Sequence, residues 1–372
     1  MQSQHRKFII SGGGTGGHVF PAIAIANALM KKCPSAEILF VGALGRMEME
    51  KVPEAGYKII GLNISGLQRR LTLKNVSTLF KLFSSLQKAK KIIKQFNPDV
   101  VIGVGGYASG PVLKIASSKK IPTVVQEQNS YPGVTNKILS KKVDKICVAY
   151  EGMEKFFPKE KIFLTGNPVR QDITVLQGKK ERGLELFGLD KSKKTVLVVG
   201  GSLGARTINN AILSHLDLFA WNNVQLIWQT GKAFFETARQ ACSDLEDQGI
   251  HAHAFISKMD YAYAAADIVV SRAGAIAISE ICLIGKPAIL VPSPNVAEDH
   301  QTKNALALSN YSAAILVKDS EAQETLAQQA IDLINDEIAC DKLSGNIARF
   351  AHKNAADSIA DLILGMVKTE QE

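Results

Sequence analysis

The sequence lacks the patterns that mark several large classes of protein. Its five cysteines are scattered and form no Cys-x-x-Cys pair, which excludes a disulfide framework and a cysteine zinc site and favours reduced thiols in a cytosolic protein. No run approaches the ~18 uncharged apolar residues that a membrane-spanning helix needs, and residues 1–10 show no signal-peptide pattern. Aromatic residues make up only 6% of the chain, so we expect no nucleic-acid partner bound by stacked aromatics.

Length, composition and charge indicate two globular domains of unequal charge. The chain has 372 residues, 46% of them hydrophobic, which is enough for two separate cores. Residues 1–168 carry 25 Lys and Arg against 10 Asp and Glu, whereas residues 169–372 carry 19 against 25. The basic part therefore predicts an anionic partner, with a merely soluble basic surface as the alternative.

Two series of short Val- and Ile-rich runs, with helical spacing between them, predict parallel β-strands covered on both faces by helices. The runs lie at residues 7–11, 37–42, 99–106, 122–128 and 145–150, and then within 193–213 and at 224–231, 251–256, 266–274 and 286–294. We therefore predict an α/β protein of two Rossmann-like domains that face each other across a cleft. The expected domains are residues 1–168, with a C-terminal helix at about 352–368, and residues 169–351.

Three glycine-rich turns follow predicted strands, at residues 11–18 (SGGGTGGH), 103–111 (GVGGYASGP) and 200–205 (GGSLGA). Gly12, Gly14 and Gly17 fit the G-x-G-x-x-G pattern of a dinucleotide site. That interpretation also needs an acidic residue at the end of the next strand, where residues 40–46 (FVGALGR) have none, so a nicotinamide cofactor is weakly supported. Bare amides at helix N-termini instead suit anions or hydroxyl oxygens.

His18 directly follows the first glycine turn. At the start of a helix the positive end of the dipole disfavours a protonated ring. A neutral imidazole that faces a ligand can accept a proton near pH 7. His18 is therefore the candidate base, although a lone histidine is more often structural or on the surface.

Glu280 is the only charged residue in the helical stretch 273–285 (AGAIAISEICLIG), which is apolar nearly all round. An isolated buried carboxylate is costly unless it is paired or hydrogen-bonded. The diol of a ribose would satisfy it, if the phosphates of the same nucleotide bind at the start of this helix. An internal partner such as Arg272 or Arg170 is the alternative.

The sequence also predicts how a diphosphate would be bound. No Asp-x-Asp motif occurs, so the usual carboxylate pair for a metal–nucleotide complex is missing, and we expect no metal site. Helix N-termini, Ser202 and a cation such as Arg170 would have to neutralise the charge. His300 and Gln301 begin a further helix after a strand and are expected at the same edge.

Seven motifs in this order resemble the MurG family of peptidoglycan N-acetylglucosaminyltransferases, over essentially the whole chain: SGGGTGGHVFPAIAIA, GVGGYASGP, QEQNSYPGVTNK, GNPVR, GGSLGA, SRAGAIAISE and HQTKNA. The resemblance implies a GT-B glycosyltransferase without a cofactor. Its substrates would be UDP-N-acetylglucosamine and undecaprenyl-diphospho-N-acetylmuramoyl-pentapeptide, whose 4-hydroxyl receives the sugar with inversion (lipid I to lipid II). It also implies a peripheral position at the cytoplasmic face of the inner membrane.

The resemblance implies roles for particular residues as well. Thr15, Gly16 and Gly17 resemble the turn that approaches the donor sugar, and Asn129 is similar to an asparagine that contacts the donor. The residues that resemble the nucleotide-sugar site are Arg170, Ser202, Ile256, Ala275, Ile276, Ala277, Ile278, Ser279 and Glu280. Gln301 is similar to a glutamine that contacts the donor sugar, with His300 as the alternative because the preceding segment varies in length among relatives.

Residues 55–98 contain nine basic residues and no acidic one, with apolar residues at helical spacing. Such a helix commonly packs on a core, and it can also rest on an anionic membrane surface, which a lipid-linked acceptor favours. Three rivals remain on the sequence alone. They are a GT-B glycosyltransferase with another lipid acceptor such as diacylglycerol, a UDP-sugar epimerase of the same fold, and a non-catalytic basic membrane-binding protein.

Overall fold

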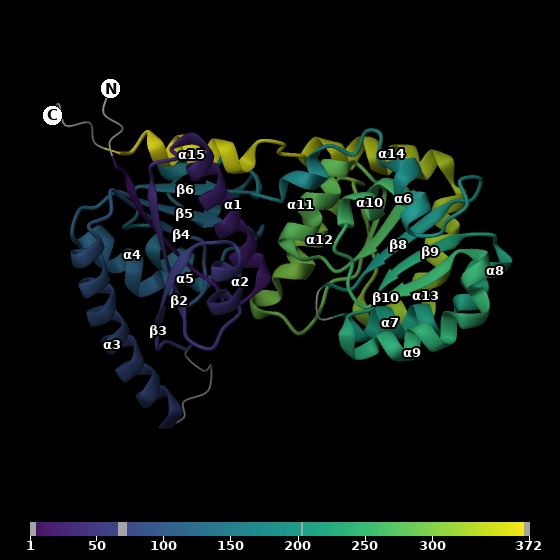
Figure 1. The fold of residues 1–372 in the computed structure, drawn as a ribbon, viewed down its shortest axis with the longest axis horizontal. Coiled ribbons are helices and arrows are strands. Elements are labelled where there is room, and N and C mark those ends of the chain that lie inside the picture. Colours follow the sequence, from purple (N-terminus) through teal and green to yellow (C-terminus); the bar gives the residue numbers. More distant parts are fainter. Residues whose placement is uncertain (1–4, 66–72, 202–203, 368–372) are drawn as a thin grey trace. The chain divides into compact units, whose positions relative to one another are not determined.

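The computed structural model describes residues 5–65, 73–201 and 204–367 (Figure 1). The chain divides into two compact units, Met1–Val169 with Asn354–Glu372, and Arg170–Lys353. Each unit is a parallel β-sheet with helices on both faces, so the predicted α/β class with two Rossmann-like domains is confirmed. In these described ranges, none of the helices has the length and hydropathy that a bilayer span needs.

The first unit contains a seven-stranded sheet in the order β3-β2-β1-β4-β5-β6-β7, with every neighbouring pair parallel. Its strands are β1 (Lys7–Ser11), β2 (Glu37–Ala43), β3 (Lys58–Leu62), β4 (Val100–Gly103), β5 (Thr123–Glu127), β6 (Lys145–Val148) and β7 (Ile162–Leu164). The sequence did not predict β3 and β7. Both are short strands at the edges of the sheet with partly exposed side chains, and short apolar runs of this kind do not distinguish a strand from a loop.

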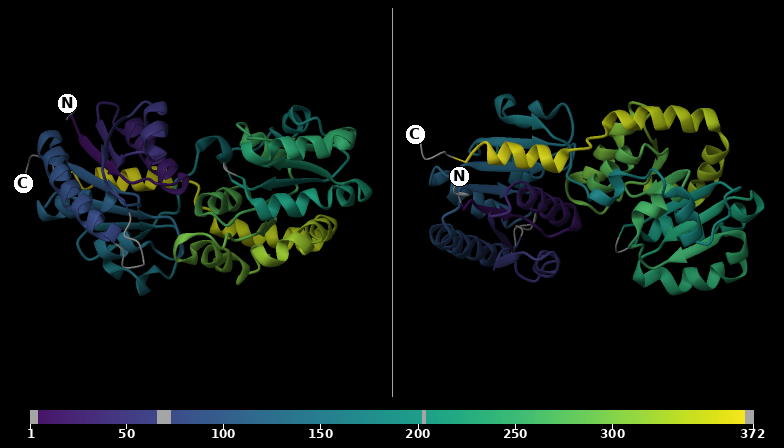
Figure 2. Two further views of the ribbon diagram at one scale, coloured as in Figure 1. Left: turned by 90° about the horizontal axis from the view of Figure 1, so that it is seen from below. Right: turned by 45° about the horizontal axis from the view of Figure 1, so that its top comes forward.

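Helices cover both faces of this sheet. Successive side chains of a strand such as β1 point to opposite faces, so its apolar residues make both faces apolar. Phe8 and Ile10 face the first layer and Ile9 faces the second. The first layer consists of α1 (Gly16–Lys32), α2 (Glu48–Glu54) and α15 (Ala355–Leu364), and the second of α3 (Leu73–Phe96), α4 (Ser109–Ser118) and α5 (Val134–Leu139). Figure 2 shows α15, in yellow, along the first sheet, where Asp361 pairs with Lys32 of α1 at 2.8 Å.

The second unit contains a six-stranded parallel sheet in the order β10-β9-β8-β11-β12-β13. Its strands are β8 (Thr195–Val199), β9 (Gln225–Gln229), β10 (Ile250–His253), β11 (Ile268–Ser271), β12 (Ala288–Leu290) and β13 (Ile315–Leu316). Its helices are α6 (Lys180–Leu186), α7 (Arg206–Leu213), α8 (Leu216–Trp221), α9 (Lys232–Cys242), α10 (Met259–Ala265), α11 (Ala275–Ile284), α12 (His300–Ser309), α13 (Asp319–Asn335) and α14 (Glu337–Ile347).

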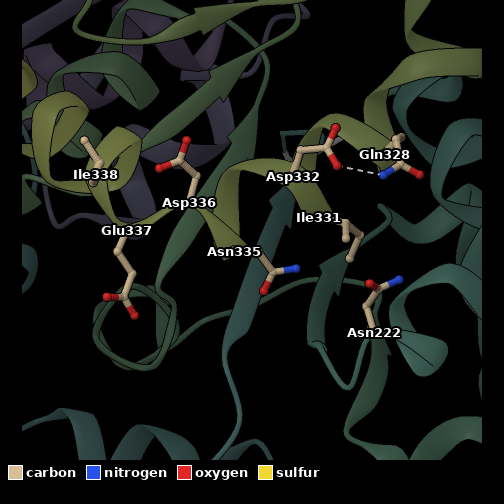
Figure 3. A pocket seen from close by; sticks show the side chains of 8 residues that line it. All are labelled: Asn222, Gln328, Ile331, Asp332, Asn335, Asp336, Glu337 and Ile338. Atoms are coloured by element: carbon tan, nitrogen blue, oxygen red, sulfur yellow. Dashed lines mark hydrogen bonds between the residues drawn. The ribbon is translucent and has the colours of Figure 1, made fainter.

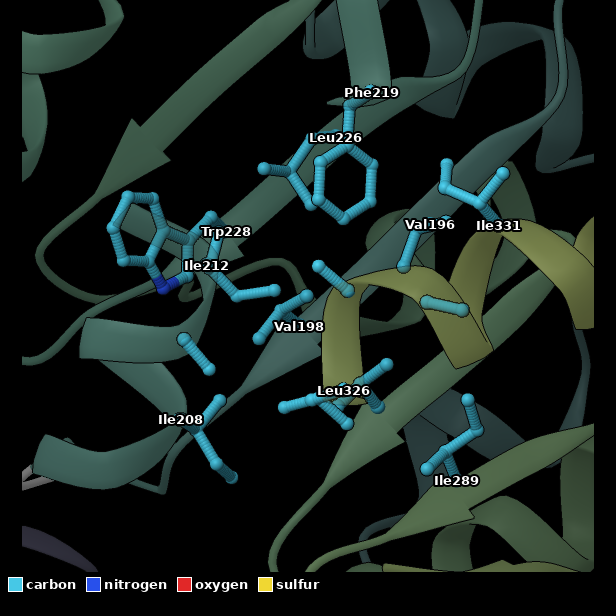
Figure 4. Close-up of a cluster of buried hydrophobic side chains, with 14 of the residues drawn as sticks. Val196, Val198, Ile208, Ile212, Phe219, Leu226, Trp228, Ile289, Leu326 and Ile331 are labelled. Atoms are coloured by element: carbon cyan, nitrogen blue, oxygen red, sulfur yellow. The ribbon is translucent and has the colours of Figure 1, made fainter. Parts of the chain in front are cut away.

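The core of the second unit lies between the sheet and a layer that includes α7, α8 and α13 (Figure 4). Trp228 and Phe219 are fully buried there, beside Val198 of the central strand β8. The indole N–H of Trp228 donates to Asn209 Oδ1 at 3.1 Å, so its one polar group is satisfied inside the apolar core.

Both sheets reverse their strand order at one point. The reversal lies between β1 and β4 in the first unit and between β8 and β11 in the second. In open α/β sheets, ligands bind beyond the carboxyl ends of the strands at such a point. The predicted site residues of each unit follow strands at or near this position.

Candidate active site

Two glycine-rich turns of the first unit interlock beyond the ends of β1 and β4. A Cβ at Gly12 would lie 2.7 Å from the carbonyl oxygen of Gly105 and would collide with Val104. Gly106 has a φ of +82°, and a Cβ there would collide with the carbonyl oxygen of Gly13. Glycine is therefore required at these positions because the two backbones touch each other.

Glu48, at the start of α2, binds the first of these turns. Glu48 is only 1% exposed, and its carboxylate accepts the Gly14 N–H at 2.8 Å and the Ala43 N–H at 2.9 Å. The sequence analysis did not identify this residue. A signal was present, since glycine inside a strand often marks a close approach, and a Cβ at Gly42 of β2 would collide with the Glu48 side chain.

His18 lies in the first turn of α1, which begins at Gly16 after the N-cap Thr15. Its Nδ1 is 3.0 Å from the carbonyl oxygen of Gly13. Because a carbonyl oxygen only accepts, Nδ1 carries a proton in this contact, and in the neutral ring the lone pair is then on Nε2. The ring covers Gly105, where a Cβ would lie 2.8 Å from Nε2. The structure thus fixes the orientation of the His18 ring at the glycine turns.

Asn129 lies in the loop after β5 and is held by a second buried carboxylate. Its backbone N–H and side-chain amide both donate to Glu127 Oε1, at 3.0 and 3.1 Å. The other oxygen of Glu127 accepts from Asn136 Nδ2 at 2.8 Å. Gln128 donates to the carbonyl of Val104 at 2.9 Å, which ties this loop to the second glycine turn. The sequence analysis missed Glu127, although a charged residue inside an apolar strand was a usable signal.

Glu280 of α11 is buried, as the sequence predicted, and the described structure supplies two internal partners. The Tyr263 hydroxyl donates to Oε2 at 3.0 Å, and Arg170 Nε lies 3.4 Å from Oε1. Burial raises the pKa of the Glu280 carboxyl above its usual value, while Arg170 and the Tyr263 hydroxyl oppose that rise. Burial also raises the pKa of the Tyr263 phenol well above its usual value, so the phenol stays a donor.

Arg272, one of the two arginines considered as a partner of Glu280, binds other groups. Arg272 pairs with Asp319 of α13 and donates to the carbonyl of Val291 at 3.1 Å. Arg170, by contrast, keeps 41% of its side chain exposed. Of the two candidates, Arg170 is therefore the one that contacts Glu280.

The start of α11 presents backbone amides beyond the end of β11. Gly274 is the N-cap, in extended conformation, and the first helical hydrogen bond runs from the Ile278 N–H to the Gly274 carbonyl at 2.9 Å. The amides before that bond have no partner inside the helix. Ile276, Ala277 and Ser279 are partly exposed in this turn, whereas Ala275 and Ile278 are buried. This geometry suits an anion at the helix start.

Gln229 joins two further predicted positions. Its buried amide donates to the Gly201 carbonyl at 3.3 Å and accepts the N–H of Ile256 at 2.9 Å. The glycine turn after β8 and the loop that carries Ile256 are therefore fixed to each other. Ser202, which the sequence placed in this site, lies outside the described residues. Gln229 was not predicted, because its role depends on two backbone groups that are distant in sequence.

Gln301 and His300 begin α12, as expected. Gln301 Oε1 accepts the N–H of Ser293 at 2.8 Å, which leaves its amide N–H groups as the available donors. The residues before this helix, Glu298 and Asp299, both have positive φ, at 55° and 51°. Such backbone strain in non-glycine residues is concentrated at functional sites.

A cavity of about 640 Å³ lies elsewhere in the second unit (Figure 3). Its lining residues come from the end of α8, from α13 and from the start of α14: Asn222, Gln328, Ile331, Asp332, Asn335, Asp336, Glu337 and Ile338. None of them is a predicted site residue. In the part of the chain that the structure describes, no group of three or more His, Cys, Asp and Glu is arranged to hold a metal ion.

Two parallel α/β units, each with glycine turns and helix starts at the switch point of its sheet, define the GT-B class of nucleotide-sugar enzymes. Comparison with known proteins narrows this class. The glycosyltransferase family 28 N-terminal domain matches residues 8–148, and the C-terminal domain of the same family matches residues 195–361. The chain belongs to glycosyltransferase family 28 and, within it, to the MurG family, which confirms the resemblance.

Individual relatives agree with this family. A curated protein of Parabacteroides distasonis is 56% identical over 97% of this chain and 98% of its own length. One of Flavobacterium psychrophilum is 54% identical over 98% of this chain and 99% of its own length. Both are named UDP-N-acetylglucosamine--N-acetylmuramyl-(pentapeptide) pyrophosphoryl-undecaprenol N-acetylglucosamine transferase. The crystal structure of Acinetobacter baumannii MurG is 27% identical, with a TM-score of 0.77 and coverage of 97% of this chain and 99% of its own. The structure of a UDP-GlcNAc 2-epimerase from Neisseria meningitidis is 16% identical, with a TM-score of 0.66 and coverage of 97% of this chain and 100% of its own. At this low identity the likeness shows a shared fold and no more.

Proposed function

We propose that this chain transfers N-acetylglucosamine from UDP-N-acetylglucosamine to the 4-hydroxyl of undecaprenyl-diphospho-N-acetylmuramoyl-pentapeptide. This reaction converts lipid I to lipid II in peptidoglycan synthesis. One observation carries the proposal: relatives that bear this activity in their names match both units of the chain at more than 50% identity. The enzyme is then a hexosyltransferase that needs no cofactor.

In this proposal the second unit binds the nucleotide of the donor. The amides at the start of α11 bind the diphosphate, and the exposed guanidinium of Arg170 adds a positive charge. Glu280 accepts the ribose hydroxyls, one turn further along the helix. Among the residues that the structure describes, its Oε1 has the long 3.4 Å contact with Arg170 and no other donor, so this oxygen has capacity for a further donor. Gln301 and the loop before it contact the sugar.

The first unit supplies the base. The acceptor hydroxyl must lose its proton as it attacks the anomeric carbon, and a positioned base typically contributes roughly 10²–10⁴-fold to such a step. His18 is proposed for this role because the Gly13 carbonyl fixes the proton on Nδ1. In this proposal the turn of Thr15, Gly16 and Gly17 approaches the donor sugar, and Asn129 contacts the donor. The bond to the UDP oxygen breaks as the new bond forms, which inverts the anomeric centre, and the helix-start amides stabilise the leaving diphosphate.

We also propose that α3 brings the enzyme to the anionic cytoplasmic face of the membrane, as a peripheral protein. The helix has two different parts. Ala89, Ile92 and Ile93 are buried in the core of the first unit, as the core-facing alternative requires. Phe80 and Phe83, however, are 74% and 63% exposed. Exposed Lys90, Lys91 and Lys94 accompany them on the same helix, a pattern typical of helices that rest on anionic lipid.

One assay tests the activity. Radiolabelled UDP-N-acetylglucosamine is incubated with a short-chain analogue of the lipid-linked muramoyl-pentapeptide, and label in the lipid product is measured. The expected result is transfer that depends on the acceptor. Transfer only to another lipid such as diacylglycerol, or epimerisation of the donor without an acceptor, would contradict the proposal and identify the rival activity.

A further inference from the structure

One peptide group of the first glycine turn is contacted by two side chains from its two ends. The Gly13 carbonyl accepts from His18 Nδ1 at 3.0 Å, and the Gly14 N–H donates to Glu48 Oε2 at 2.8 Å. This carbonyl and this N–H belong to the same planar peptide unit. Glu48 and His18, 30 residues apart in the sequence, are therefore joined through a single peptide group.

Such a chain of hydrogen bonds is cooperative, since each bond polarises the next. A carboxylate that accepts the Gly14 N–H increases the negative charge on the Gly13 oxygen. That oxygen then holds the Nδ1 proton of His18 more firmly, and Nε2 becomes the better proton acceptor. In the Ser-His-Asp triad a carboxylate fixes the histidine tautomer directly. Here the same effect would pass through a peptide bond.

Glu48 is held in the position that this coupling requires. It is 1% exposed, and its second oxygen accepts the Ala43 N–H at 2.9 Å. Side chains are absent at Gly13 and Gly42, where a Cβ would collide with the carboxylate or its stem. Among the described residues no cation pairs with Glu48, so its contacts are amides, one of which belongs to the turn that orients His18.

We propose that Glu48 is a positioning residue for His18. It acts through the Gly13–Gly14 peptide to keep the imidazole proton on Nδ1 and the lone pair on Nε2. The inference rests on the proposed role of His18 as the base. A carboxylate that only braces the glycine turn is the competing explanation, and the test must separate the two.

The test is a double-mutant cycle with His18→Ala and Glu48→Gln. Glu50→Gln is the matched control, because the Glu50 side chain lies on the same helix and is 70% exposed. Loss of a side chain that orients a functional group typically lowers activity roughly 10–100-fold. We expect Glu48→Gln to lower kcat by roughly 10–100-fold, while KM for UDP-N-acetylglucosamine changes less than about twofold. The acidic limb of its pH–rate profile should move. In the His18→Ala background, Glu48→Gln should change kcat less than about twofold. Glu50→Gln should behave as the wild type.

Additive losses in the cycle would show that Glu48 acts independently of His18 and would overturn the inference. Wild-type turnover of His18→Ala would instead remove His18 from the proposed function, whatever Glu48 does. If Glu48→Gln does not fold, nitrogen NMR of the wild-type enzyme with labelled histidine decides. The inference is supported if the wild-type His18 ring carries its proton on Nδ1 and if the folded Glu48→Asp variant shows a changed distribution of that proton between Nδ1 and Nε2. A proton on Nε2 in the wild type overturns the inference.

Discussion

Arg170 Nε lies 3.4 Å from Glu280 Oε1, across 110 residues of sequence. The contact is longer than a typical charge-assisted hydrogen bond, and 41% of the arginine side chain is exposed. Glu280 is almost fully buried and shares its other oxygen with Tyr263. The pair therefore places a partly exposed cation next to a buried carboxylate on the second turn of α11.

Replacement of Glu280 by alanine should weaken donor binding. Loss of hydrogen bonds to a charged acceptor typically costs about 1.5–3 kcal/mol, or roughly 10–150-fold in UDP affinity. Isothermal titration calorimetry measures this directly, with Glu337→Ala, whose carboxylate is exposed, as the control. Unchanged UDP affinity in a folded Glu280→Ala variant would refute the ribose assignment.

Replacement of His18 by alanine should lower turnover without changing nucleotide affinity. A positioned base is worth roughly 10²–10⁴-fold, and we expect a kcat loss in that range. Calorimetric UDP affinity should stay within about twofold, because the ring is assigned to the acceptor proton and not to the nucleotide. His5→Ala, which removes an exposed histidine, is the control. An equal loss of UDP affinity and turnover would show that His18 binds the donor instead.

The stability of the second unit should fall in mild acid because of His253. Burial, with a contribution from nearby His251, lowers the pKa of His253 to about 4 from its ordinary 6.5. The unfolded chain then binds a proton between these values that the folded chain does not, so stability is full above about pH 6.5 and is lost as the pH falls to about 4. The loss is at most about 3 kcal/mol, because part of the ring is exposed.

Urea unfolding at pH values on either side of this window checks the assignment. His253→Leu should have a smaller loss of unfolding free energy between neutral pH and about pH 5 than the wild type. His5→Ala should retain the wild-type loss. A His253→Leu curve parallel to that of the wild type would show that other groups cause the pH dependence.

Replacement of Phe80 and Phe83 by serine should weaken binding to anionic vesicles. Both rings are exposed on α3, so the change removes apolar area from the surface and little from the core. We expect the variant to bind roughly tenfold more weakly in vesicle sedimentation. Binding of the wild type should also weaken with salt, because each basic residue near anionic lipid adds about 1 kcal/mol of electrostatic attraction. Trp221→Ser, at an 81% exposed site of the second unit, is the control. Equal binding of the wild type to neutral and anionic vesicles would contradict the membrane proposal.

Features that depend on the chemistry of single residues could be predicted from the sequence. The apolar runs of the central strands, the glycine turns and the burial of Glu280 all follow from residue types and their spacing. The edge strands β3 and β7 were missed because each offers only a short apolar run, which is ambiguous without its neighbour in the sheet. The MurG resemblance supplied residue roles that no spacing argument could give.

Features that depend on long-range backbone contacts could not be predicted. Glu48 and Glu50 are alike in sequence, and only the fold brings one of them to the amides of Gly14 and Ala43. The same is true of Arg170 and Arg272, either of which was a reasonable partner for Glu280 until tertiary structure separated them. A pattern shows that a buried charge needs a partner, but it does not show which partner.

The return of α15 to the first unit has a consequence for biosynthesis. This helix contributes Ile359 and Ile363, both fully buried, to the core around β1, so that core draws on both ends of the chain. During translation the first unit must wait for Ala355–Leu364 to leave the ribosome, while the second unit, which is continuous in sequence, can complete its own core earlier. The unit whose synthesis begins first can therefore complete its core only when nearly the whole chain has been made.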